Sequence, residues 1–116
     1  MASNDCLFCR IRDGVIPAKP LYRDEHCFVL EDINPQAPTH LLVLPNRHIP
    51  TVNDLQAGDE ALVGHLFTTA ARLAAERGIS GSGYRLVMNT LEDAGQTVFH
   101  LHLHLLGGRA LGWPPG

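Results

Sequence analysis

The chain has 116 residues, of which 45% are apolar and 18% charged, and its formal net charge is −3 at pH 7. This length predicts one domain, residues 1–116, and the slightly acidic balance argues against a nucleic-acid binder, because such domains are usually strongly basic. No apolar run approaches the roughly 18 residues of a bilayer-spanning helix, and the first residues lack a signal-peptide pattern. We therefore expect a cytoplasmic protein that neither spans a membrane nor binds nucleic acid.

Taken in chain order, the sequence predicts a short helix, three strands, one long helix and two further strands. The short helix is expected at Leu7–Arg12, and the long helix is indicated by a stripe of apolar residues at helical spacing. That stripe consists of Leu62, Val63, Leu66, Phe67, Ala70, Leu73 and Ala74. The carboxylates of Asp59 and Glu60 favour the start of this helix, and Gly78 favours its end.

Short apolar runs bounded by turn residues predict the strands. They lie at Leu21–Arg23, Cys27–Leu30, Leu41–Leu44, Tyr84–Met88 and Val98–Leu106. Consecutive strands with short connections favour an antiparallel sheet of about five strands with the long helix on one face, which is the α+β class. A sheet this small has exposed edges, and these favour a dimer.

The segment HLHLHLL, from His100 to Leu106, has a histidine at every second position. In a strand, His100, His102 and His104 would share one face, while the leucines between them would meet the core. Neighbouring imidazoles cannot all be protonated without repulsion, so the array indicates a functional site rather than ordinary packing. Two chemistries remain open: a metal hydrolase or lyase site, or imidazoles that act as nucleophile and acid–base groups.

A polar loop precedes the histidines and contains Asn89, Gly95, Gln96 and Thr97. Gly95 permits a close approach of the backbone, and main-chain N–H groups in such a loop can bind an anion. The side chains of Gln96 and Thr97 add neutral donors. Such a loop beside imidazoles suits a phosphate better than a water-activating metal.

The ending GQTVFHLHLHLLGGRALGWPPG closely resembles the histidine triad (HIT) family, whose signature is His-x-His-x-His followed by two apolar residues. The segment IPAKPLYRDEHCFVLEDINPQAPTHLLVLPNRHIP is similar to the first half of the nucleotide-binding HINT branch of that family. The resemblance extends from about Asp5 to Gly116. It implies a homodimeric purine nucleoside 5′-phosphoramidase, which cleaves the P–N bond of a nucleoside phosphoramidate and releases the nucleoside monophosphate.

The same resemblance implies roles for individual residues. His102 would be the nucleophile, His104 would contact the phosphate or the leaving group, and His40 would position His102. The expected nucleotide-binding residues, besides His102 and His104, are Phe8 and Ile16 at the base, Glu31, Asp32 and Ile33 at the nucleoside, and Asn89, Gly95, Gln96 and Thr97 at the phosphate. From the residues alone, the alternative for Asp32 is that it only caps a turn before Asn34 and Pro35. The source of the leaving-group proton stays open.

Cys6 and Cys9 have the C-x₂-C spacing of half a zinc site, and no strand precedes them as a thioredoxin-like motif would require. Family members with this pair bind a structural zinc, which implies His48 and His100 as the other two ligands. Four protein ligands leave no open position, so the zinc would be structural and the chemistry would need no cofactor. The alternative is that both cysteines are free thiols.

The sequence departs from better-known animal relatives at two of these positions. Glu31 stands where they carry a histidine, and Thr97 stands where they carry a serine. Two other functions remain as alternatives: a dinucleoside polyphosphate hydrolase of the same superfamily, and a nucleotide-binding regulatory or scaffold protein. Trp113, in the C-terminal tail, either reaches the partner subunit's site or anchors the tail.

Overall fold

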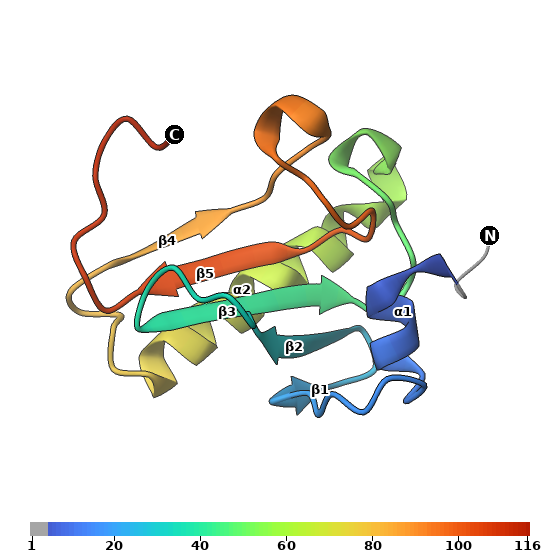
Figure 1. Ribbon diagram of the computed structural model, residues 1–116, viewed down its shortest axis with the longest axis horizontal. Helices are drawn as coiled ribbons and strands as arrows, with labels where there is room; N and C mark the ends of the chain where they lie inside the picture. Colours follow the sequence, from blue (N-terminus) through green and yellow to red (C-terminus); the bar gives the residue numbers. More distant parts are fainter. Residues whose placement is uncertain (1–4) are drawn as a thin grey trace.

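The computed structural model describes residues 5–116 and contains one antiparallel sheet with a long helix behind it (Figure 1). The strands are β1 (Tyr22–Arg23), β2 (Cys27–Glu31), β3 (Thr39–Pro45), β4 (Tyr84–Val87) and β5 (Leu103–Gly107). Their order across the sheet is β1-β2-β3-β5-β4. The helices are α1 (Leu7–Arg12) and α2 (Glu60–Glu76), and short 3₁₀ turns lie at Val52–Asp54, Ala57–Asp59 and Glu92–Ala94. The predicted α+β fold, with five strands, one long helix and one short helix, is confirmed.

Helix α2 packs across one face of the sheet, mainly over the central strands β3 and β5. The buried part of its stripe packs on side chains of alternate positions in the central strands, and these residues are Leu66, Ala70, Leu73, Ala74, Cys27, Val29, Leu41, Val43, Leu103 and Leu105. Phe67 departs from the prediction, since 42% of its surface is exposed. The helix ends as expected: Gly78 has φ of +75°, a backbone conformation that glycine adopts without strain, and its N–H donates to the carbonyl of Ala75.

The other face of the sheet is only partly covered. Helix α1 lies against β2 and β3, where Phe8, Cys9 and Ile11 pack with alternate residues of the two strands: Phe28, Leu30, Leu42 and Leu44. Figure 1 shows α1 at one end of this face, with the rest of the face free of helices. Side chains of β3 and β5 that point to this side, beyond α1, are therefore the ones available to a ligand.

The histidine segment differs from the prediction in one respect. A strand was expected over Val98–Leu106, but the paired strand begins only at Leu103. Before it, the N–H of Leu101 donates to the carbonyl of Ile49 at 2.7 Å, outside the sheet ladder. The three alternating leucines are buried as predicted, but His100 is also fully buried and does not stand on the open face with its neighbours.

The two edges of the sheet are β1 and β4. Strand β4 is half-buried along its whole length, so its outer side remains available for pairing. Within residues 5–116, no helix is both long and apolar enough to cross a membrane.

Candidate active site and metal centre

Three predicted histidines meet on the open face of the sheet. In the register of β3 and β5, His40 opposes Leu106 and Leu42 opposes His104, so the two histidines are diagonal neighbours. Nε2 of His40 lies 2.9 Å from Nδ1 of His104. The ring of His102, just before β5, lies with its centroid 5.0 Å from that of His104.

A main-chain group determines where the protons of this pair lie. The N–H of Gln36 donates to Nδ1 of His40 at 3.0 Å, so that nitrogen carries no proton. Neutral His40 must then carry its proton on Nε2, from which it donates to Nδ1 of His104. His104 in turn carries its own proton on Nε2. One amide therefore makes the free nitrogen of His104 a hydrogen-bond donor.

His102 is oriented in the opposite sense. Its Nδ1–H donates to the carbonyl oxygen of His100 at 2.7 Å, which leaves the lone pair on Nε2. The ring of Phe8 packs edge-on against His102, with centroids 5.2 Å apart, and restricts how the imidazole can turn. The result is a nucleophilic nitrogen on His102 beside a donor nitrogen on His104.

The electrostatics of the face keep both rings neutral. Burial, followed by the nearness of His102 and His40, lowers the pKa of His104 to about 4. Burial also lowers the pKa of His102 below its ordinary value. Desolvation has this direction because it disfavours the charged form of a histidine. Near pH 7 the site thus holds one imidazole with a free lone pair and a second, uncharged imidazole with an N–H donor, a combination that suits attack on a phosphorus atom.

Asp32 lies beside this pair. One carboxylate oxygen accepts the N–H of Asn34 at 2.8 Å, and the other lies 3.4 Å from Nε2 of His40. Side-chain atoms of Asp32, His40 and His104 lie within 4.8 Å of one another, as metal ligands would. However, the His40–His104 hydrogen bond already occupies the facing nitrogens, so this group is better described as a hydrogen-bonded array. Asp32 both caps its turn and stays close to the histidines.

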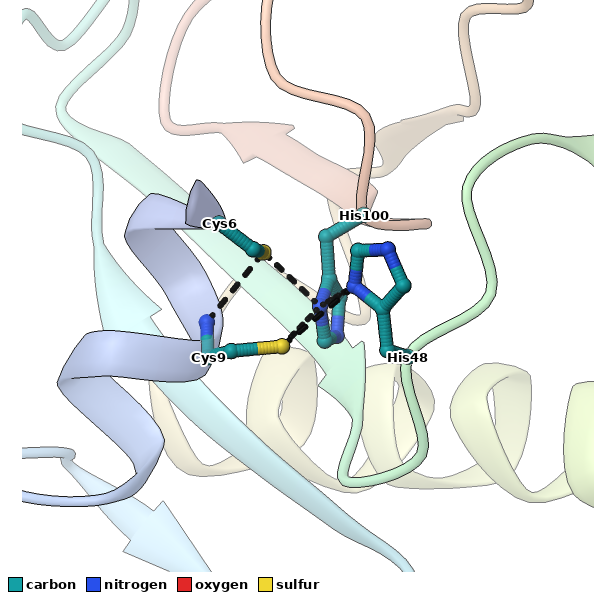
Figure 2. A group of neighbouring side chains, drawn as sticks. All are labelled: Cys6, Cys9, His48 and His100. Carbon is teal, nitrogen blue, oxygen red and sulfur yellow. Dashed lines mark hydrogen bonds between the residues drawn. The ribbon is translucent and has the colours of Figure 1, made fainter. Parts of the chain in front are cut away.

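The predicted metal ligands also come together. Figure 2 shows four side chains directed at one point. They are Cys6 at the N-cap of α1, Cys9 within α1, His48 from the loop after β3 and His100 from the segment before β5. Nδ1 of His100 lies 3.4 Å from the sulfur of each cysteine. Nδ1 of His48 lies 3.3 Å from the sulfur of Cys9 and 3.2 Å from Nδ1 of His100. Around a tetrahedral zinc, with ordinary Zn–N and Zn–S bonds, ligand atoms are roughly 3.3–3.8 Å apart. The four side chains therefore fit such an ion.

The surroundings prepare these groups as ligands. The carbonyl of Pro45 accepts a hydrogen bond from Nε2–H of His100 at 2.8 Å, so Nδ1 keeps the lone pair that faces the sulfurs. Burial lowers the pKa of His100 to about 4. Burial and then contact with Cys6 raise the pKa of the Cys9 thiol to about 11, and a bound cation would favour its deprotonation.

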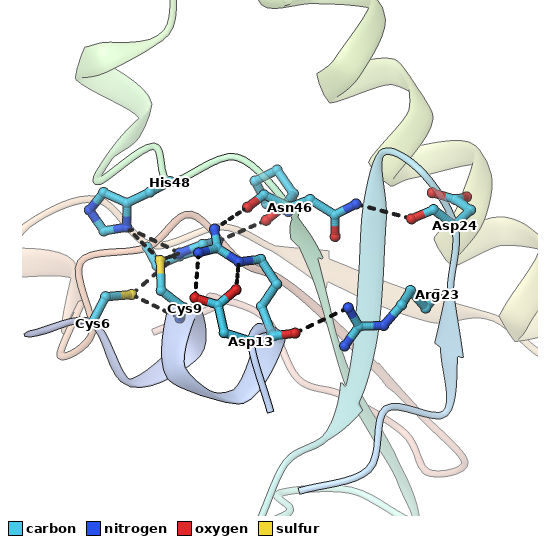
Figure 3. A network of polar contacts seen from close by, with 10 residues as sticks. Cys6, Cys9, Asp13, Arg23, Asp24, Asn46 and His48 are labelled. Carbon is cyan, nitrogen blue, oxygen red and sulfur yellow. Dashed lines mark hydrogen bonds and ion pairs between the residues drawn. The ribbon is translucent and has the colours of Figure 1, made fainter. Parts of the chain in front are cut away.

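A polar network joins the end of α1 to the sheet beside this centre (Figure 3). The guanidinium of Arg12 donates to the carbonyl of Asn46 at 2.6 Å and forms two hydrogen bonds with Asp13. The side chain of Asn46 donates to the carbonyl of Asp24. Because Asn46 precedes His48 by two residues, these bonds hold the loop that supplies a ligand.

The residues expected to bind the nucleotide lie on three parts of the chain: near α1, at the end of β2 and in the loop before the histidines. Phe8 and Ile16 join the apolar cluster under α1, on the same side of the sheet as His102. Ile33 is fully exposed beyond the end of β2. Asn89 is half-buried, Gly95 has φ of +84° at the end of a 3₁₀ turn, and Thr97 lines a hollow of about 430 Å³ beside Cys6 and His48.

Two residues are placed differently from the prediction. Glu31 shares its face with Val29, towards α2, and its carboxylate lies 4.0 Å from Arg77, so it points away from the histidines. Gln96 is buried, and its side-chain amide is used by main-chain groups: it accepts from the N–H of Leu91 and donates to the carbonyls of Pro50 and Val98. Gln96 therefore shapes the loop instead of offering free donors.

Sequence reasoning missed the main-chain groups that orient the histidines. The N–H of Gln36 and the carbonyls of Pro45 and His100 act through atoms that every residue carries, so no side-chain pattern marks them. It also missed Arg109, whose Nε donates to the carbonyl of Gln36 at 3.0 Å. The only sequence signal there is its place after Gly107 and Gly108.

This open-faced sheet with its paired histidines is the arrangement of one known family. The family model described as HIT domain matches residues 13–111, and the chain belongs to that family. It is 47% identical over 110 residues to the purine nucleoside phosphoramidase of Escherichia coli K12, covering 95% of this chain and 92% of that protein.

Solved structures give the same result. A HIT family hydrolase from Legionella pneumophila Philadelphia 1 superposes with a TM-score of 0.93 at 50% identity, over 96% of this chain and 99% of that one. A HIT family hydrolase from Clostridium thermocellum gives a TM-score of 0.90 at 40% identity, over 94% and 95% of the two chains.

Proposed function

We propose that this protein is a purine nucleoside phosphoramidase, which hydrolyses the P–N bond of nucleoside 5′-phosphoramidates. The observation that carries the proposal is the opposite orientation of two adjacent neutral imidazoles, a bare Nε2 on His102 and an Nε2–H on His104. The identity of 47% to the Escherichia coli purine nucleoside phosphoramidase supports the same activity.

The reaction begins when Nε2 of His102 attacks the α-phosphorus. The P–N bond breaks as a bond from phosphorus to His102 forms, and the departing nitrogen takes up one proton from solvent. Nε2–H of His104 donates a hydrogen bond to that nitrogen as negative charge develops on it. A water molecule then cleaves the nucleotidyl-imidazole, returns one proton to solvent and releases the nucleoside monophosphate.

The nucleotide is held, in this proposal, on the free part of the sheet face. Phe8 and Ile16 supply the apolar surface for a purine, and Ile33 extends it from the end of β2. The carboxylate of Asp32 is the acceptor for the ribose hydroxyls, because its oxygens have spare lone pairs. Main-chain groups near Gly95, with the side chains of Asn89 and Thr97, contact the phosphate.

The metal centre is proposed to hold a structural zinc on Cys6, Cys9, His48 and His100. Four ligands from three separate segments would tie α1 to the loops beside the active site, and they leave no open position for a substrate. Zinc supplies cross-linking stability here. The phosphoramidase chemistry is assigned to imidazole alone.

The assembly is proposed to be a homodimer of single-domain chains in the cytoplasm. The free outer side of β4 favours pairing with a second copy. The three cysteines form no disulfide, which suits a reducing compartment. Sedimentation at about twice the 12.7 kDa of one chain would support the dimer, and a 12.7 kDa species at micromolar concentration would contradict it.

The test of the activity is release of AMP from adenosine 5′-phosphoramidate by wild type and His102→Ala. We expect the variant to lose activity by a factor on the order of 10³ or more, the scale of loss when a nucleophile is removed. Rapid alkaline quench of the wild type should trap AMP covalently on His102, because a nucleotidyl-imidazole is labile in acid and stable in base. His26→Ala is the matched control, because this histidine is exposed on the β1–β2 turn, away from the site.

Two outcomes would contradict the proposal. Full activity of His102→Ala would rule out His102 as the nucleophile. Immediate loss of wild-type activity on adding a chelator would assign the chemistry to a metal. Faster turnover of a dinucleoside polyphosphate than of the phosphoramidate would place the enzyme in another branch of the family.

A further inference from the structure

Arg109 follows the last strand and contacts a segment far away in sequence. Its Nε donates to the carbonyl of Gln36 at 3.0 Å, and a second guanidinium nitrogen donates to the carbonyl of Ala110. Within residues 5–116, no carboxylate lies at ion-pair distance from this exposed arginine. Its charge is therefore not used for a salt bridge, and its long-range bond is directed at one main-chain carbonyl.

That carbonyl belongs to the residue whose N–H orients His40. Three hydrogen bonds form one chain: Arg109 to the carbonyl of Gln36, the N–H of Gln36 to Nδ1 of His40, and Nε2 of His40 to Nδ1 of His104. The lengths are 3.0, 3.0 and 2.9 Å. Gln36 is itself exposed, and its side-chain amide donates to the carbonyl of Asn34 at 3.0 Å within the same loop. Arg109 is the contact that reaches the main chain of Gln36 from a distant part of the sequence.

A packing contact reinforces the same junction. Gly108 has φ of +94°, and a Cβ at this position would lie 2.9 Å from Cβ of Pro38. The segment after β5 therefore lies directly against the loop between β2 and β3. The backbone turn at Gly108 brings Arg109 over that loop.

We propose that Arg109 is a positioning residue for the reaction. By holding the carbonyl of Gln36, it keeps the N–H of that residue on Nδ1 of His40 and so keeps the proton of His104 on Nε2, where the leaving group departs. This proposal rests on the proposed phosphoramidase function. It predicts that Arg109 matters for expulsion of the leaving group and little for binding of the nucleotide.

The test compares two leaving groups in wild type and Arg109→Ala. An amine leaves a phosphoramidate with developing negative charge and depends on the donor, whereas p-nitrophenolate leaves adenosine 5′-(p-nitrophenyl phosphate) without such help. We expect kcat for the phosphoramidate to fall about 10-fold or more, within the range assigned to acid–base assistance. The nitrophenyl substrate should change less than about 2-fold, and KM for both should stay nearly constant.

Arg85→Ala is the matched control, since Arg85 also donates to a distant main-chain carbonyl, that of Gly112, at 2.8 Å. Arg109→Lys keeps one donor and should recover part of kcat, and it also replaces the alanine variant if that one fails to fold. An equal loss on both substrates in Arg109→Ala, or the same pattern in Arg85→Ala, would overturn the proposal in favour of general stabilisation.

A second measurement needs no substrate. Long-range ¹H–¹⁵N spectra identify which ring nitrogen of His40 and His104 is protonated. Wild type should show both protons on Nε2, and Arg109→Ala should show a mixture for His40. Unchanged spectra together with unchanged kcat would refute the role of Arg109 while leaving the phosphoramidase proposal intact. Failure of the wild type to hydrolyse either substrate would instead count against the proposed function, and the spectra would still decide the role of Arg109.

Discussion

At the scale of the residue, identical side chains acquire different roles because each imidazole has one nitrogen bonded to the main chain. His40 accepts from the N–H of Gln36, His102 donates to the carbonyl of His100, and the ring of His100 donates to the carbonyl of Pro45. The remaining nitrogen is then a donor on His40 and carries a free lone pair on His102 and His100, which suits the proposed roles of nucleophile and metal ligand. The roles are determined by backbone geometry and not by residue type.

The neutrality of His104 can be measured directly. Its pKa is lowered to about 4 by burial and by its histidine neighbours, so an NMR titration of its ring should show a midpoint well below the ordinary value of about 6.5. The folded chain binds this proton only at a lower pH than the unfolded chain does. The free energy of unfolding should therefore fall as the pH drops from about 6.5 towards 4. A midpoint above 6 would mean that His104 is charged in part of the working range.

At the scale of the element, Asp24 joins β1, β2 and α2. Its carboxylate accepts hydrogen bonds from the hydroxyl of Tyr22, the N–H groups of His26 and Cys27, and Nε2 of His65. These bonds to the charged form outweigh burial, and they hold the pKa of Asp24 well below its usual range. One carboxylate therefore links the long helix to the first two strands.

Asp24→Asn should lower the free energy of unfolding at pH 7 by about 1–3 kcal/mol, the cost of losing hydrogen bonds to a charged group. A depressed carboxylate pKa contributes stability at neutral pH that disappears as the pH falls below about 4. Urea denaturation should therefore show a large difference from wild type at pH 7 and a smaller one at pH 3. Glu25→Gln, on the neighbouring 87% exposed side chain, is the control. The same difference at both pH values would argue against a charge effect.

The turn after β5 gives a second prediction at this scale. Gly108→Ala combines a strained backbone at φ of +94° with a contact of 2.9 Å to Pro38, so we expect a loss of about 1–3 kcal/mol in the free energy of unfolding. Gly64, in the middle of α2, has open space around it, and Gly64→Ala should raise stability by roughly 0.5–1 kcal/mol. Thermal denaturation should show a lower melting temperature for Gly108→Ala and a higher one for Gly64→Ala. A stabilised Gly108→Ala variant would contradict the expected clash with Pro38.

At the scale of the whole molecule, the four-ligand centre links α1 with the loop after β3 and the segment before β5. If it holds zinc, metal analysis should find one ion per chain, and a chelator should lower the melting temperature. Cys9→Ser should act in the same direction. AMP release measured well below the melting temperature should change little at once, because the ion is not at the reacting atoms. A chelator without effect on melting would indicate free thiols.

The sequence predicted the elements better than the positions of single side chains. The helical stripe, the strand runs and the alternating leucines were recognisable, because burial of apolar residues follows the period of a helix or strand. The late start of β5 and the burial of His100 were not, since both involve contacts with distant segments: the N–H of Leu101 donates to the carbonyl of Ile49, and the ring of His100 meets the cysteine pair near the start of the chain. The direction of the Glu31 side chain could not be predicted either. It lies on the same face of β2 as Val29, and only the structure shows that α2 covers that face.

One residue contacts both groups of side chains, because the ring of His100 faces the cysteines while its carbonyl accepts a hydrogen bond from Nδ1–H of His102. An ion bound by the four side chains would therefore be a spectroscopic probe of events at His102. If the protein is loaded with Co²⁺ in place of zinc, its visible absorption bands, which respond to small changes in ligand geometry, should shift when AMP binds next to His102. A colour change at an ion that takes no part in the chemistry would then report each nucleotide that arrives and leaves.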